Sequence, residues 1–128
     1  MPRSSGRKIS GSRPKELLIS LRVVSDGRGA FGPGKAELLN WVVKTGSLRA
    51  AAEKMSMSYM KAWRLTRDMN QCFSEPLVLT ERGGSERGGS TVTPLGLQVM
   101  RDYAAMENSV QRAAQPSWKK LSRQLKAG

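Results

Sequence analysis

The chain contains no histidine and a single cysteine, Cys72, and these shortages exclude several kinds of chemistry. One cysteine cannot form an internal disulfide, and without histidine the usual ligands of a zinc site are missing. A serine–histidine–aspartate triad is excluded because its general base is a histidine. No acid pair stands out, and no nucleophile stands beside a base. We therefore predict no enzyme, no catalytic residue, no metal site and no cofactor.

Long apolar runs are also missing. No stretch approaches the roughly 18 apolar residues that would suggest a membrane span. The arginine-rich start lacks the apolar stretch and cleavage site of a secretory signal. We expect a cytoplasmic protein without a membrane partner, and 128 residues fit one domain with a single core.

Acidic residues are scarce, with 10 against 22 lysines and arginines, so the net charge is +12. Most of the excess lies at the ends, because residues 1–15 and 112–128 each carry five bases and no acid. We expect a flexible basic arm over residues 1–15, a domain over 16–114 and a basic tail over 115–128. The basic ends either add sequence-independent attraction to phosphates or are merely solvated termini.

The first part of the domain reads as a strand, a turn and a helix. Residues 16–25 are β-branched and apolar on both faces, which predicts a strand that is at least half buried. Residues 26–30 supply turn chemistry. A helix is expected over 35–45, with its core side made by Leu38, Leu39, Val42 and Val43 and with Trp41 beside them.

Two further helices follow, joined by a tight turn. Gly46 is placed to end the preceding helix, and Ser47 to cap an alanine-rich helix over 48–55. Ala51 has a small side chain, which lets the next helix cross closely. Ser56 and Met57 form the turn, and Ser58 is expected to cap a helix that runs to about residue 70.

The helix after Ser58 has two different sides. At 100° per residue, one broad side collects Tyr59, Ala62, Trp63, Leu65, Thr66 and Met69. Lys61, Arg64 and Arg67 fall on the other side with Met60, and Asp68 is the only acid on the helix. A buried side opposite a cationic one, after a short helix and a tight turn, suits insertion into a DNA major groove. An ordinary solvated helix surface is the alternative.

A glycine-rich hairpin is predicted next. A strand signal covers residues 77–81, a Glu-Arg-Gly-Gly-Ser unit occurs twice over 81–90, and residues 91–93 resume an extended pattern. We interpret this as the wing of a winged helix-turn-helix, with its glycines letting the backbone approach a phosphate. A flexible linker is the alternative. A P-loop is excluded, because no Gly-Lys-Ser or Gly-Lys-Thr follows the glycines.

A long helix is expected from Pro94, capped by Thr93, to about residue 114. Its apolar stripe is longer than one small domain can cover, so we predict that part of it pairs with a second copy of the chain. The dimerisation residues are expected to be Val99, Met100, Tyr103, Met106 and Val110. After Pro116, a short basic amphipathic segment extends this seam, frays, or lies on a membrane surface.

Several short motifs resemble, in order and spacing, the N-terminal domain of ModE-type molybdate-responsive regulators. They are Phe31-Gly32-Pro33-Gly34-Lys35, Thr45-Gly46-Ser47-Leu48, Met57-Ser58-Tyr59 with Lys61-Ala62-Trp63, Met69-Asn70, Glu75-Pro76-Leu77-Val78 and Val92-Thr93-Pro94-Leu95-Gly96. The resemblance covers about residues 16–113, whereas LysR-type domains share only the general pattern.

This resemblance implies a dimeric DNA-binding transcription factor with Lys61, Arg64, Arg67 and the wing at the DNA. Met60 stands where family members often carry a basic residue, and Ser56 replaces a common turn glycine. The family's oxyanion-sensing C-terminal domains have no counterpart in these 128 residues. We therefore expect no direct binding of molybdate.

Together these observations predict an α+β fold, mostly α: a winged helix-turn-helix with an N-terminal strand, a small antiparallel wing hairpin and a long C-terminal dimerisation helix. The predicted function is sequence-specific binding of double-stranded DNA by a homodimer that regulates transcription. The residues expected to read bases are Ser58, Met60, Lys61 and Arg64. Those expected at the DNA backbone are Ser47, Arg49, Arg67, Arg82, Gly83, Gly84, Ser85, Arg87, Gly88, Gly89 and Ser90. Two alternatives stay open, a non-specific nucleic-acid-binding architectural protein and a winged helix that serves only protein interaction.

Overall fold

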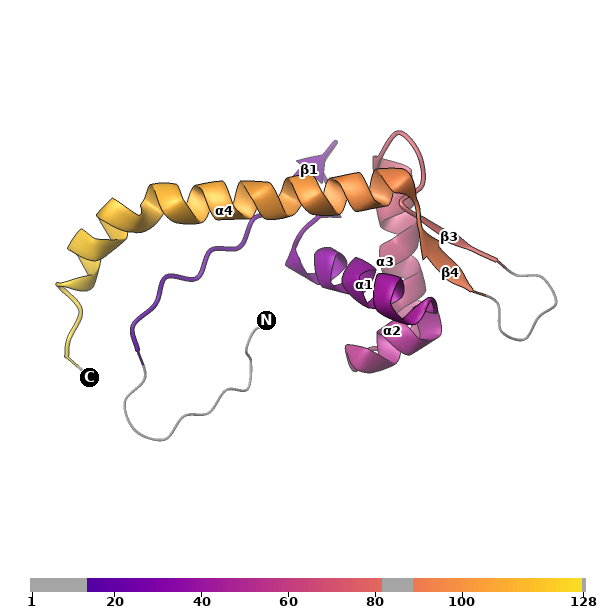
Figure 1. Cartoon of the computed structure of the whole chain (residues 1–128), viewed down its shortest axis with the longest axis horizontal. Coiled ribbons are helices and arrows are strands. Elements are labelled where there is room, and N and C mark those ends of the chain that lie inside the picture. The colour runs from indigo at the N-terminus through magenta and orange to yellow at the C-terminus, as the bar shows by residue number, and fades with distance from the viewer. Residues whose placement is uncertain (1–13, 82–88, 128) are drawn as a thin grey trace.

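The computed structural model describes residues 14–81 and 89–127. In this part of the chain the fold is α+β and mostly helical, with four helices and two small antiparallel sheets of two strands each. Helices α1–α3 and both hairpins form a head, and α4 extends far beyond it (Figure 1). The mostly helical α+β prediction is confirmed. Among the described residues, no helix combines the length and the apolar character needed to cross a membrane.

The chain enters the head through a hairpin of β1 (Val23–Ser25) and β2 (Arg28–Phe31). Asp26 and Gly27 form its two-residue turn, and both have positive φ, at 50° and 76°. That conformation matches the twist of antiparallel strands, which explains the preference for Asp-Gly in such turns. The prediction that residues 26–30 are all turn was therefore wrong, because only two of them turn and the rest start a strand.

The predicted strand over residues 16–25 is also shorter than expected. Only its last three residues pair with a neighbour, and residues 14–22 run as unpaired chain alongside α4 (Figure 1). Leu17, Ile19 and Leu21 are half-buried, while Leu18 is 81% exposed. The alternating burial expected of a strand is present. What is missing is a partner strand, since no described strand pairs with residues 14–22.

Helix α1 (Pro33–Thr45) begins two residues before the predicted start, with Pro33 at its first position. It ends at Gly46, whose φ of 70° is the left-handed conformation that favours glycine at a helix end. Leu38, Leu39 and Val42 are fully buried as expected. Val43, assigned to the core side, is 51% exposed because the head covers a narrower side of α1 than the apolar pattern suggested.

Helices α2 (Leu48–Lys54) and α3 (Tyr59–Cys72) follow the expected order. The hydroxyl oxygens of Ser47 and Ser58 accept hydrogen bonds from the amides of Ala50 and Lys61, both at 3.0 Å, so both predicted caps are confirmed. Such caps stabilise a helix start by about 1 kcal/mol. The turn between the helices includes Ser56, whose φ is 54°.

The second hairpin consists of β3 (Val78–Thr80) and β4 (Ser90–Val92), which pair antiparallel as predicted, with Val78 opposite Val92. It projects from the head on the side away from the long part of α4 (Figure 1). Its base is fixed to the head, because Ser90 donates its backbone N–H to the carbonyl of Gly46 at 2.9 Å.

Helix α4 (Pro94–Ser122) is capped by Thr93 as expected, but it does not stop near residue 114. It continues through Pro116 for another six residues and curves near its end in Figure 1. A proline removes one helix hydrogen bond and crowds the preceding turn, which usually bends a helix rather than ending it when good helix formers follow. The expected boundary between residues 114 and 115 therefore falls inside one helix.

The core lies where α1, α2, α3 and the start of α4 meet. Phe31 at the end of β2 joins three elements, since its ring lies edge-on to Tyr103 of α4 at 5.1 Å and to Phe73 at 6.3 Å. Tyr103 is 4% exposed, and its hydroxyl donates to the carbonyl of Leu21 at 2.8 Å. This contact ties the N-terminal segment to α4.

Replacing Tyr103 with phenylalanine tests this contact. We expect the free energy of unfolding at pH 7 to fall by about 1 kcal/mol, the usual contribution of one hydrogen bond. Burial, and secondarily the charge of Glu107, raise the pKa of Tyr103 above its ordinary value of 10.0. A raised pKa means that folding favours the neutral phenol, so this stability is complete below pH 10 and is lost at higher pH. Urea unfolding at pH 7 and 11 should show the gap between wild type and variant closing, and a gap that widens with pH would contradict the assignment.

Candidate nucleic-acid interface

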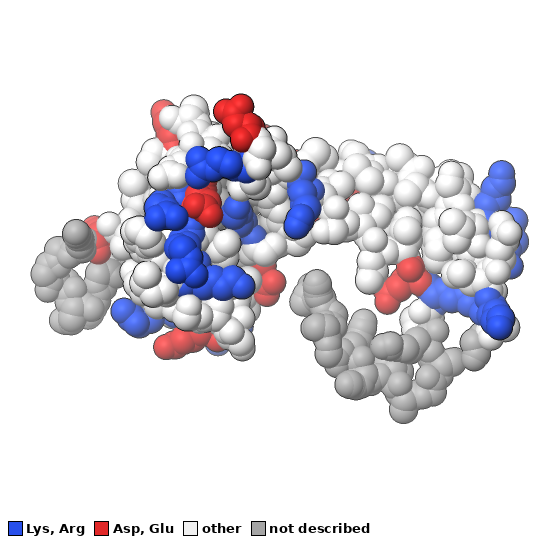
Figure 2. Space-filling model, turned by 180° about the vertical axis from the view of Figure 1, so that it is seen from behind, with Lys and Arg blue, Asp and Glu red and all other residues white. Residues whose placement is uncertain are grey.

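The outer face of α3 carries the cations that the sequence placed there. Lys61, Arg64 and Arg67 are exposed, and Met60 is 56% exposed between them. Figure 2 views the side of the molecule that lies at the back in Figure 1, and Lys and Arg side chains gather over the head there, with an acidic group among them. The first two turns of α3 therefore present a cationic, partly apolar surface.

The opposite face of α3 fixes the helix in place. Ala62 and Met69 are fully buried and Thr66 is 6% exposed. Ala51 of α2 is also fully buried, in the position where the sequence predicts a side chain small enough for two helices to cross. Because both helices are capped and tightly packed, α3 holds its outer face on a rigid support, which favours precise contacts.

Trp63 differs from its prediction. It was assigned to the buried side of α3, yet it is 41% exposed, and the guanidinium of Arg67 lies 5.3 Å from its ring. The buried side is narrower than the sequence pattern suggested, because Trp63 lines the open groove between α3 and β3 and no described element packs over its ring. Arg67 also approaches Asp68 at 3.7 Å, a surface ion pair that contributes little stability.

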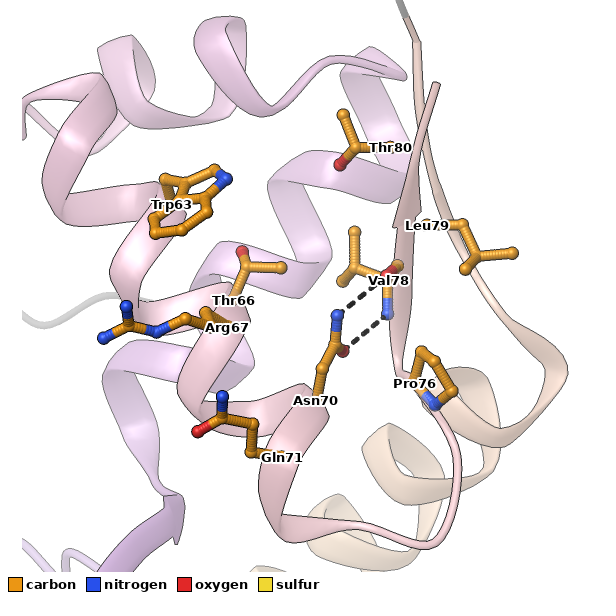
Figure 3. Close-up of a pocket in the computed structure, with 9 residues that line it drawn as sticks. All are labelled: Trp63, Thr66, Arg67, Asn70, Gln71, Pro76, Val78, Leu79 and Thr80. Carbon is orange, nitrogen blue, oxygen red and sulfur yellow. Dashed lines mark hydrogen bonds between the residues drawn. The ribbon is translucent and has the colours of Figure 1, made fainter. Parts of the chain in front are cut away.

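A groove of about 310 Å³ separates α3 from β3 (Figure 3). Asn70 closes its inner end, with its side-chain amide donating to the carbonyl of Val78 at 3.0 Å and accepting from the amides of Leu77 and Val78 at 2.8 and 3.2 Å. The hydroxyl of Thr66 is buried in the groove wall and has no hydrogen-bond partner among the described residues. Asn70 thus fixes the β3–β4 hairpin relative to α3.

The start of α2 lies beside the base of that hairpin. Ser90 donates its backbone N–H to the carbonyl of Gly46 at 2.9 Å, which brings Ser90 and Gly89 next to Ser47. Arg49 reaches across to α3, where its guanidinium lies 4.5 Å from the ring of Tyr59. The fold therefore gathers Ser47, Arg49 and the described end of the hairpin near one another. Arg82, Gly83, Gly84, Ser85, Arg87 and Gly88, also expected at the DNA backbone, lie outside the described residues.

The residues assigned to dimerisation are divided between the core and the surface. Tyr103 is buried within its own chain. Val99 and Met100 pack against the core as half-buried residues. Met106 is 42% exposed and Val110 half-buried, on the part of α4 that extends beyond the head. The head covers the first half of the stripe and leaves the second half accessible.

Sequence reasoning missed the role of Asn70 and the cations on the β1–β2 hairpin. Nothing in the pattern of an asparagine near a helix end distinguishes a strand clamp from an ordinary surface residue. The hairpin did have a signal, since Asp-Gly is typical of a two-residue hairpin turn. Applying that signal would have placed Arg28 on a strand, where its guanidinium now donates to the side chain of Gln71 on α3 at 2.8 Å.

Comparisons with curated proteins point in the same direction as the motifs. The molybdenum-pterin-binding protein MopB of Rhodobacter capsulatus is 36% identical over 89 residues, which cover 69% of this chain and 33% of MopB. The molybdenum transport protein ModE of Azotobacter vinelandii is 31% identical over 97 residues, or 76% of this chain and 36% of that protein. A ModE-type relationship is supported. No protein-family model matches the chain.

A third relative is the DNA-binding transcriptional dual regulator ModE of Escherichia coli K12, which is 30% identical over 98 residues, or 77% of this chain and 37% of that protein. The chain thus spans about a third of the length of the curated relatives that it matches. These relatives are named as regulators, a transport protein or molybdenum-pterin-binding proteins, and not as enzymes, in agreement with the predicted absence of catalysis.

Proposed function

We propose that this chain is a DNA-binding transcriptional regulator that inserts α3 into the major groove. The observation that carries the proposal is the outer face of α3, where exposed Lys61, Arg64 and Met60 stand on a helix anchored by fully buried Ala62 and Met69. A rigid helix with two cations and an apolar side chain on its first turns suits the major groove. Lys61 and Arg64 suit the acceptors of guanine, and Met60 suits a thymine methyl group.

The surrounding elements fit a winged helix-turn-helix in this proposal. Helices α2 and α3 would form the helix-turn-helix, and the β3–β4 hairpin, fixed to α3 by Asn70, would form the wing. Ser58 would contact bases at the start of α3. Ser47, Arg49, Arg67, Gly89 and Ser90 would contact the DNA backbone beside it.

Homodimerisation is the second part of the proposal. Beyond the head, α4 carries an apolar stripe that includes Met106, Val110 and Leu121, the last 54% exposed. A second copy packing against this stripe would bury it and would place two α3 helices on successive turns of DNA. The sequence preferred by such a dimer consists of two inverted half-sites about 10 base pairs apart.

Selection of bound sequences from random duplex DNA tests both parts. We expect enrichment of a motif with two inverted half-sites, and binding to it that is at least about 10³-fold tighter than binding to scrambled duplex at physiological salt. The matched scrambled duplex controls for attraction by net charge. If no motif is enriched although the duplexes bind, the non-specific architectural function, which the charge of +12 favours, replaces this proposal.

We further expect the 128-residue chain not to bind molybdate directly. A tetrahedral oxyanion needs several converging N–H and hydroxyl donors. The α3–β3 groove offers the Thr66 hydroxyl and Arg67, and Arg67 already approaches Asp68. Calorimetric titration with molybdate, and with sulfate as the matched oxyanion, should show no saturation. A saturable response to molybdate alone, in the micromolar range, would contradict this expectation.

A further inference from the structure

The side of α3 that faces away from β3 carries a second groove, of about 530 Å³. Its walls come from the β1–β2 hairpin and the start of α1 on one side, and from α3 on the other. Phe31 and Leu65 contribute apolar wall, and the cations in its lining are Arg22, Lys35 and Lys61, with no acid among the lining residues. In this groove, called here the hairpin groove, every charged side chain of the lining is therefore positive.

Two of these cations have free capacity for an anion. The ammonium of Lys35 donates to the carbonyl of Gly29 at 2.7 Å, which uses one of its three N–H groups and holds the side chain over the groove. Arg22 is exposed just before β1, and no ion pair involving it or Lys35 occurs within residues 14–81 and 89–127. Both side chains are therefore free to form an ion pair with an anionic ligand such as a phosphate group.

The two grooves lie on opposite flanks of α3. On the helix circumference, Trp63 and Asn70 border the β3 side, and Lys61 and Leu65 border the hairpin side, with Arg64 between the two. A helix with its side chains is about 10–12 Å across, and the DNA major groove is about 12 Å wide. A helix inserted there therefore has one phosphate backbone on each flank.

We propose that the hairpin groove is a second DNA-backbone site, in which Arg22 and Lys35 contact phosphates of the strand opposite the one at the β3–β4 hairpin. The inference rests on the proposed insertion of α3. It adds a contact from the N-terminal hairpin and the start of α1, so that α3 is held from both edges of the groove. Such contacts fix orientation and add affinity without selecting sequence.

The test compares wild type with the double variant Arg22→Gln/Lys35→Gln on the duplex selected by wild type and on its scrambled form. Each lost phosphate contact lowers the slope of log affinity against log salt by about 0.9, so the slope should fall by about 1.8 for each protomer on the DNA, or about 3.6 for the proposed dimer. Between 50 and 200 mM salt, the advantage of wild type over the variant should therefore shrink about twelvefold for each protomer bound. The ratio of affinities for selected and scrambled duplex should stay unchanged.

Two controls separate a phosphate contact from other causes. Lys44→Gln/Lys54→Gln removes the same charge from the ends of α1 and α2, where the two ammonium groups lie 5.0 and 5.5 Å from the ring of Trp41, and should leave the slope unchanged. Lys35→Arg keeps the charge and should keep the salt slope, whereas Lys35→Gln should lower the slope. The thermal unfolding midpoint of each variant shows whether the protein remains folded. A single neutral methylphosphonate linkage in the DNA backbone should weaken the binding of wild type when it replaces a phosphate that contacts the hairpin groove. The same linkage should leave the affinity of the double variant unchanged.

The hairpin-groove site and the proposed DNA-binding function can fail separately in these experiments. An unchanged salt slope in Arg22→Gln/Lys35→Gln, with selective binding by wild type intact, would overturn the hairpin site and leave the proposed function standing. A wild type that binds no duplex in a salt-dependent manner would overturn the proposed function itself. A changed preference for sequence in the double variant would also overturn the inference, because it would mean that these side chains read bases.

Discussion

Replacing Lys61 and Arg64 together by alanine is expected to remove most of the discrimination between the selected duplex and its scrambled form. Both side chains are exposed on the first turns of α3, on the face opposite fully buried Ala62 and Met69. Each good contact to a base edge contributes about 1–3 kcal/mol of discrimination, so the loss of two corresponds to about 30-fold or more. Equilibrium titration of both duplexes at one salt concentration measures the ratio directly.

The ratio is the informative quantity, because phosphate contacts weaken binding to both duplexes equally and cancel. Lys44→Ala/Lys54→Ala is a matched control, since these two lysines lie 5.0 and 5.5 Å from the ring of Trp41 at the ends of α1 and α2. It removes the same charge and should keep the ratio. If the Lys61/Arg64 variant kept the wild-type ratio, α3 would not be the element that reads the sequence.

Gly96→Ala is expected to lower the free energy of unfolding by about 2 kcal/mol, as overpacking of a filled site typically does. A Cβ at this position would lie 2.5 Å from the carbonyl oxygen of Leu77 and 2.7 Å from a methyl of Val92. Leu77 cannot easily yield, because its carbonyl accepts from Thr93 and its amide donates to Asn70. The variant should therefore displace the base of the β3–β4 hairpin, and urea unfolding measures the cost.

Gly34→Ala is the matched control for that substitution. Gly34 also lies in the first turn of a helix, α1, but a Cβ there meets nothing within 4 Å. Alanine is favoured over glycine in a helix by about 0.5–1 kcal/mol, so this variant should be as stable as wild type or more stable. Equal losses in the two variants would show that the contact with Leu77 is not the cause.

The order of elements followed from local chemistry and could be predicted almost completely. Capping hydroxyls at Ser47, Ser58 and Thr93 fixed three helix starts, and Gly46 fixed one helix end, because each acts within a few residues of its own position. The expectation that the last helix ends near residue 114 was wrong, because the backbone hydrogen bonds of the helix on both sides of Pro116 outweigh the single hydrogen bond that proline removes. Local reasoning also failed at residues 28–31, which pair with residues earlier in the chain.

The exposed cations of the candidate site could be predicted for the same reason. Lys61, Arg64 and Arg67 share one face of α3 by helical spacing alone, and the structure leaves all three exposed. The cations of the hairpin groove could not be predicted, because Arg22 and Lys35 approach Lys61 only after the β1–β2 hairpin packs along α3. Their proximity depends on contacts between residues about 26 to 39 positions apart in the chain.

The sequence by itself determined the order of the helices, the charge of the outer face of α3 and the absence of an internal disulfide, since these depend on residue type and short-range spacing. Only the tertiary structure decided how wide each buried face is, which left Trp63 and Val43 exposed and enclosed Tyr103. It also decided where the flanking grooves lie. The burial of a side chain depends on which element packs against it. An amphipathic pattern indicates that one face of a helix is buried, but not how wide the buried face is.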